Sequence, residues 1–261
     1  WLQRNFGEAP AYYDKLSQSR NRLRMKKMLK DNGFFRSDIE VDTLKKGKKI
    51  EMTYHVITNG QYKVNQVFLP SDTTAIGRVI RRNQAKTLIK PGEFYSENAL
   101  TNERVRLNEI VSREGYLEFN ENYIYYFTDT LKGTFTADIY MKVKPPSDGI
   151  THRRYKIGKT IIHSNYDLSD PSSIEDKDTV QIKSDMIILE NEHLIEHKVL
   201  DRMILQNEGD VVSQKLQNVS VSHLLDLGIF KFVNLRYERI TDSLEPIVNR
   251  NFYLTPDFNQ N

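Results

Sequence analysis

The sequence contains no cysteine, a single tryptophan and only 8 prolines among its 261 residues. Without cysteine the chain has no disulfide, thiolate zinc site, iron–sulfur cluster or cysteine nucleophile. Its longest apolar runs, such as residues 186–189, fall far short of the roughly 20 residues of a transmembrane helix. The sequence also lacks a P-loop, a G-x-G-x-x-G motif and a G-x-S-x-G motif, and we predict that it is not an enzyme.

Apolar and aromatic residues are nevertheless plentiful enough for a folded core. Hydrophobic residues make up 38% of the chain, and there are 14 tyrosines and 12 phenylalanines. The length suggests roughly two domains at about 150 residues each. The net charge is only +3, which gives no reason to expect a nucleic-acid partner.

One local pattern occurs three times: the end of a helix, a glycine, and then a bulky pair. The glycines are Gly33, Gly115 and Gly228, and two adjacent apolar residues lie three to five positions before each. This spacing places an apolar side chain on the buried face of the last helical turn, and the glycine ends the helix in a left-handed conformation. Alternating residues then predict a hairpin after each glycine. The predicted strands are 38–41 with 50–56, 123–127 with 135–143, and 231–237 with 247–254.

An opening strand and two helices complete the repeating unit. Residues 62–69 match residues 155–162 in type and register, which predicts an opening strand in the second and third copies. The helices of the middle copy are predicted at 74–83 and 98–114. In the second helix we expect a buried stripe of Leu100, Leu107, Ile110 and Val111, with Glu103, Arg104 and Arg106 toward the polar side.

The predicted fold is therefore α+β, with three tandem β-α-α-β-β modules in an elongated array. Each module is expected to be a three-stranded mixed sheet packed on two helices. We place the modules at 1–61, 62–147 and 153–256, and the first is truncated and lacks its opening strand. The third carries an acidic insertion at 164–192, with strands of its own predicted at 179–182 and 186–189.

These modules resemble POTRA domains of the BamA/TamA superfamily of outer-membrane assembly factors. The resemblance covers nearly the whole chain and is most specific in the middle module. It looks closest to the TamA-like lipoprotein branch (TamL) of Bacteroidetes. The residues that carry it are 88–95, 102–106 and 115–119, with compatible segments at 7–10 and 252–256.

The resemblance implies a non-enzymatic scaffold on the periplasmic face of the outer membrane of a Gram-negative bacterium. It implies unfolded outer-membrane β-barrel clients, a membrane β-barrel of the same protein beginning after this segment, and a TamB-like partner anchored in the inner membrane. It implies no cofactor and no metal.

In POTRA-like modules the last strand is central, so the opening and middle strands are edges. An edge strand presents unpaired backbone groups to which an extended client can add as a further strand. The sequence favours the edge at 123–127, because four of its five residues are aromatic. The candidate docking residues are Tyr123, Ile124, Tyr125, Tyr126 and Phe127, with Ile39, Val41, Val233 and Leu235 on the other two edges.

Two alternatives belong to other classes of function. His193, Glu196 and His197 match H-x-x-E-H, in which two histidines one helical turn apart share a zinc ion and the glutamate acts as general base. Such a zinc peptidase needs a further ligand, for which Glu238 or Glu245 is available, and a solvated helix start is the simpler interpretation. The third hypothesis is a structural spacer that holds a partner at a fixed distance.

Overall fold

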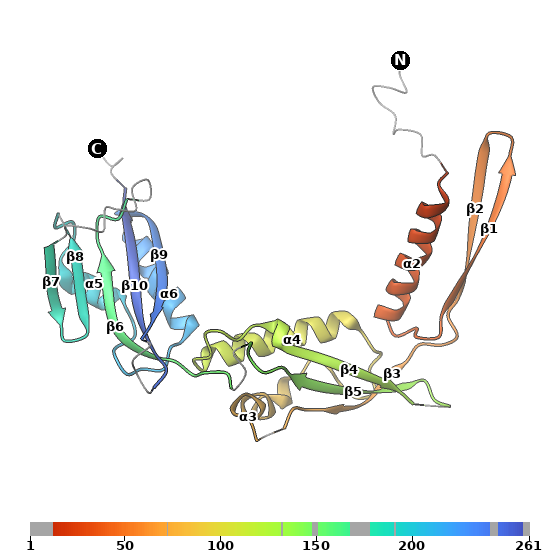
Figure 1. Ribbon diagram of the computed structural model, residues 1–261, viewed down its shortest axis with the longest axis horizontal. Helices are drawn as coiled ribbons and strands as arrows, with labels where there is room; N and C mark the ends of the chain where they lie inside the picture. The colour runs from red at the N-terminus through yellow and green to blue at the C-terminus, as the bar shows by residue number, and fades with distance from the viewer. Residues whose placement is uncertain are drawn as a thin grey trace, which may run out of the picture. The chain divides into compact units, whose positions relative to one another are not determined.

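The computed structural model describes residues 13–71, 73–131, 133–147, 151–167, 178–190, 192–240 and 245–257. Within these ranges the chain is α+β, as predicted, with sheets of two, three and five strands (Figure 1). It divides into two compact units: one of residues 1–73, 81–105 and 124–143, the other of residues 74–80, 106–123 and 144–261. None of the helices in the described ranges is both long and apolar enough to span a bilayer.

The first sheet pairs β1 (Asp38–Lys46) with β2 (Lys49–Ile57) in antiparallel register and follows helix α2 (Lys15–Asp31). The helix begins at Asp14, whose carboxylate accepts the backbone N–H groups of Leu16 and Ser17. Lys26 on the helix lies 3.2 Å from the carboxylate of Asp38 at the start of β1. In the described residues this sheet has two strands.

The middle sheet has the order β3 (Lys63–Phe68), β5 (Thr136–Val143), β4 (Ile124–Thr130). Strand β3 runs parallel to β5 and β4 runs antiparallel to it, so the sheet is mixed as predicted. One predicted boundary is wrong: Tyr123 ends the short 3₁₀ helix η2 (Glu121–Tyr123), and the strand begins one residue later. The core that includes this sheet contains Val64, Ile89, Tyr95, Leu100 and Ile139.

Helices α3 (Ala75–Arg82) and α4 (Glu97–Arg113) lie close to their predicted bounds, with the short 3₁₀ helix η1 (Gln84–Lys86) between them. In α4, Leu100, Leu107 and Val111 are buried as expected, and Ile110 is only partly buried. The placement of Glu103 on the polar side is wrong, because it is 1% exposed. Its carboxylate accepts the backbone N–H of Leu88 at 3.0 Å and the hydroxyl of Thr87 at 3.1 Å, and these bonds compensate its burial.

The third sheet has five strands in the order β7 (Asp178–Lys183), β8 (Met186–Glu190), β6 (Lys156–His163), β10 (Ile247–Pro256), β9 (Phe230–Arg239). Helices α5 (His197–Met203) and α6 (Gln214–Asp226) connect β8 to β9. The two strands predicted in the insertion are confirmed, but they extend the sheet rather than standing apart. The expectation that the opening strand is an edge is therefore wrong here, because β8 pairs in parallel with β6.

The middle and third sheets share one register. In each, the opening strand pairs in parallel with the central strand, and two residues of the opening strand face one of the central strand at a β-bulge. Val64 and Val67 face Ala137 and Ile139 in the middle sheet; Ile157 and Thr160 face Val248 and Arg250 in the third. The matching of 62–69 with 155–162 is thus confirmed in space.

Gly33 and Gly115 each follow a helix, precede a hairpin and pair with the residue just before the next opening strand. Both have positive φ, 83° and 93°, which a side chain would strain. The carbonyl of Gly33 accepts the N–H of Tyr62, and that of Gly115 accepts the N–H of Tyr155, each at 2.9 Å. A Cβ on Gly115 would lie 2.5 Å from Cγ1 of Val211, so any other residue here would displace that side chain.

Candidate functional site

Strand β4 is an open edge of the middle sheet. In the part of the chain that the structure describes, it pairs with β5 and with no other strand. The bonds Lys144 N–H to Tyr123 C=O and Leu131 N–H to Thr136 C=O fix the phase of the ladder. Because hydrogen-bonded pairs alternate, the backbone groups of Tyr125, Phe127 and Asp129 face β5. Those of Ile124, Tyr126 and Thr128 then face the open edge.

The side chains of β4 alternate between the core and the opposite face of the sheet. Ile124 is buried, and Tyr126 packs against the core cluster that contains Val64 and Ile139. Tyr125 and Phe127 point the other way and are 42% and 60% exposed. Of the predicted docking residues on this strand, these two can contact an added strand with their side chains, whereas Ile124 and Tyr126 offer backbone groups.

Three rings form a row across the open face of the middle sheet, one from each strand: Phe68, Tyr140 and Phe127. Register places Phe68 and Phe127 on either side of Tyr140. Phe68 stacks on Tyr140 with ring centroids 4.6 Å apart, and Phe127 lies tilted against it at 6.1 Å. Beside this aromatic row, a shallow hollow is lined by Tyr125, Phe127, Asp129, Tyr140 and Lys142. An apolar strip thus runs across the sheet and ends at its edge strand, β4.

The other predicted docking residues are at least partly buried. Ile39 on β1 is fully buried and Val41 is half-buried. On β9, Val233 and Leu235 pack against the core of the third sheet. Tyr123 lies outside any edge strand and packs against Phe119 and His152, at centroid distances of 5.6 and 4.6 Å.

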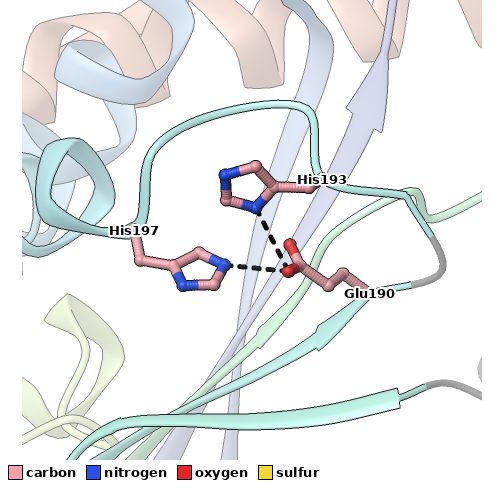
Figure 2. Close-up of side chains that lie close together, drawn as sticks. All are labelled: Glu190, His193 and His197. Carbon is pink, nitrogen blue, oxygen red and sulfur yellow. Dashed lines mark hydrogen bonds and ion pairs between the residues drawn. The ribbon is translucent and has the colours of Figure 1, made fainter.

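The histidine motif does not have the geometry of the inverted zinc peptidases. His193 precedes α5 and His197 is its first residue, so the expectation of two ligands on one helix is wrong. Glu245 pairs instead with Lys156, at 2.6 Å. The residue that meets both imidazoles is Glu190, at the end of β8 (Figure 2).

The sequence-based prediction missed Phe68, Tyr140 and Glu190. Phe68 and Tyr140 lie at outward-facing positions of predicted strands, and the alternation of residues along each strand could have predicted this. Their alignment with Phe127 depends on the pairing register, which a local pattern does not contain. Glu190 lies three residues before His193, but the spacing alone does not show that its carboxylate contacts both rings.

No protein-family model matches the sequence, and no curated protein matches it. Many solved structures are similar to it, including these three. BamA POTRA3-5 of Haemophilus influenzae is 13% identical over 94% of this chain and 83% of that one, with a TM-score of 0.47. BamA of Haemophilus ducreyi lacking POTRA domains 1-3 is 13% identical over 75% of this chain and 30% of that one, with a TM-score of 0.49. POTRA1-3 of Omp85 from Anabaena is 12% identical over 95% and 84%, with a TM-score of 0.31.

Proposed function

We propose that this chain is an array of POTRA-like modules, at 1–61, 62–147 and 153–256, that receives extended polypeptides at the edge of its middle sheet. The observation that carries the proposal is the aromatic row leading to the open edge of β4. The described parts of the chain offer no comparable exposed row on the third sheet, where the equivalent positions hold Ile161, Asn251 and Arg236.

Strand addition at β4 uses backbone and side chains for different purposes. The outward backbone groups of Ile124, Tyr126 and Thr128 are bound by any extended peptide, so they supply affinity without reading sequence. Tyr125 and Phe127 then contact every second side chain of the added strand. This favours clients with aromatic or aliphatic residues at alternate positions.

That alternation is the sequence signature of membrane β-barrel strands, which run about ten residues with apolar side chains on one face. We therefore propose unfolded outer-membrane β-barrel proteins as the clients and the periplasm as the site of action. The protein would pass them to a β-barrel of its own, as a TamL-type factor of a Bacteroidetes species would, with a TamB-like partner. The role is that of a scaffold without catalysis.

The backbone contribution is tested by two substitutions at one residue. Thr128→Pro removes an N–H that faces the open edge while leaving the bonds to β5 in place, and edge strands tolerate proline. Thr128→Ala keeps that N–H and serves as the matched control. Binding of a synthetic peptide of about ten residues with alternating aromatic side chains is measured by fluorescence anisotropy. We expect Thr128→Pro to weaken binding by about tenfold and Thr128→Ala to leave it nearly unchanged.

The side-chain contribution is tested by site-specific photo-crosslinking. A photoreactive phenylalanine analogue at Phe127 should capture the peptide and unfolded β-barrel proteins. The control position is Arg113, on the exposed surface of α4. Equal capture at both positions, or equal affinity of the two Thr128 variants, would show that β4 is not the docking edge.

A further inference from the structure

Glu190, His193 and His197 converge on one point beside the third sheet (Figure 2). One carboxylate oxygen of Glu190 lies 2.8 Å from Nε2 of His197 and 3.4 Å from Nδ1 of His193. All three potential ligand atoms lie within 4.8 Å of one another. From these contacts we propose that the three residues bind a zinc ion that links β8 to α5.

The distances suit a metal of this size. Ligand atoms at about 2.0–2.2 Å from a tetrahedral zinc ion are about 3.3–3.5 Å from each other. The pair formed by Glu190 and His193 has this spacing already, and the closer pair needs to separate by only about 0.5 Å. The ligand nitrogens of the two histidines lie within 4.8 Å of each other and must approach by up to about 1.4 Å.

The chemistry of the ligands selects the class of metal. Two imidazole nitrogens and one carboxylate oxygen suit zinc, whereas calcium and magnesium prefer oxygen alone. The chain has no thiolate and only 6 histidines, two of which meet at this carboxylate. Water is available for the fourth position, because the side chain of His193 is 51% exposed.

Glu190 is largely buried, unlike a typical surface carboxylate, and its position is fixed by the strand that it ends. Its side chain is only 10% exposed, and it ends the strand that the insertion adds beside β6. A metal held by Glu190 and the two histidines fixes the end of β8 to the start of α5. Zinc binding should therefore stabilise the folded state, since the unfolded chain does not bring the three ligands together.

Glu196 separates this site from a peptidase centre. Its carboxylate approaches Nε2 of His193, at 4.0 Å, which is the nitrogen on the other side of the ring from Glu190. It is 82% exposed and belongs to no ligand cluster in the described residues. Zinc binding should therefore be independent of Glu196.

The test is direct titration of the purified chain with zinc chloride, after removal of any polyhistidine tag, by isothermal calorimetry. Cobalt(II) absorption reports the coordination geometry. We expect one zinc per chain, the intense visible bands of four-coordinate cobalt, and a melting temperature raised by several degrees. Magnesium should have no effect.

Variants locate the ligands. Glu190→Gln, His193→Ala and His197→Ala should each weaken zinc binding by at least about tenfold, while Glu196→Gln and the control His223→Ala should bind as the parent does. Glu190→Gln retains the shape of the side chain, and circular dichroism checks that each variant is folded. Absence of zinc binding by the parent chain, or equal binding by Glu190→Gln, would show that the three residues form a hydrogen-bonded cluster only.

Discussion

The middle sheet and the third sheet share one strand arrangement but carry different side chains. Comparing them separates the backbone pairing that forms the module from the side chains that are available to bind other molecules. Both place a parallel opening strand and an antiparallel edge strand on either side of a central strand, with a bulge at the same position. Backbone pairing is thus conserved between the copies while the side chains on it differ. The differences occur on both faces.

On the buried face, one position holds an apolar residue in one sheet and a charge in the other. Ile139 on β5 and Arg250 on β10 are both fully buried and face Val67 and Thr160 across the bulge. Nε of Arg250 donates to the hydroxyl of Thr160 at 2.7 Å, and Nη2 donates to the backbone carbonyl of Gln206. At this position the middle sheet has apolar packing by Ile139. In the third sheet, the guanidinium of Arg250 instead bonds to the segment between α5 and α6.

On the other face, the contrast lies at the edge strand. Tyr125 and Phe127 on β4 correspond in register to Asn234 and Arg236 on β9. The guanidinium of Arg236 lies over the ring of Tyr253, 4.9 Å from its centroid, and Tyr166 packs against the same ring. In the third sheet, Tyr253 is therefore covered by side chains of the same protein. In the middle sheet, the aromatic row remains exposed.

The largest expected effect comes from replacing the two equivalent core residues by methionine. Arg250→Met removes the donors to Gln206 and Thr160 and should lower the free energy of unfolding by about 3 kcal/mol. Ile139→Met changes shape without removing a hydrogen bond and should cost about 1 kcal/mol. Urea denaturation combined with hydrogen exchange at β10 and β5 measures both. Equal costs would show that the charge contributes nothing specific to the third sheet.

The second prediction concerns Tyr237 on β9, whose counterpart on β4 is Thr128. Burial raises the pKa of Tyr237 to about 12, because the phenolate is disfavoured away from water. The folded state thus holds this proton more tightly than the unfolded chain, whose pKa is near 10. The resulting stability is complete below pH about 10 and is lost as the pH rises toward 12.

Tyr237→Phe removes this titration. The stability of the parent chain relative to the variant should fall by about 2 kcal/mol between neutral pH and pH about 12. Thermal unfolding of both proteins across this range measures the difference. A difference that does not change with pH would show that the phenol is equally solvated in both states.

The elements of these sheets were predictable from sequence because their signals are local. Alternation places β4, β5 and β10 near their observed bounds, and a glycine follows each predicted helix end with positive φ. The two strands of the insertion were also predicted, since each is a short β-rich run between turn residues.

What the sequence could not supply depends on partners distant in the chain. We expected Glu103 on the polar side of α4, because the sequence of the helix does not show that the N–H of Leu88 donates to its carboxylate. Pairing of β8 with β6 was missed because a strand pattern does not specify its neighbour. The contacts of Glu190 with two imidazoles were missed for a similar reason, because they depend on how the chain folds around β8 and α5.

The smallest expected effect is a gain, and it tests whether the aromatic residues alone distinguish the two edges. Asn234→Tyr with Arg236→Phe copies the residues of β4 onto β9, where the outward backbone groups of Val233 and Leu235 have the same phase. Both positions are exposed, so stability should change by no more than about 0.5 kcal/mol. Binding of the alternating aromatic peptide, with β4 blocked by Thr128→Pro, should strengthen only a few-fold, because Asn251 stands where the middle sheet has Tyr140. The matched variant Asn234→Ser with Arg236→Lys should show no gain. If both double variants bind equally, the open backbone edge is sufficient and the aromatic row does not select clients.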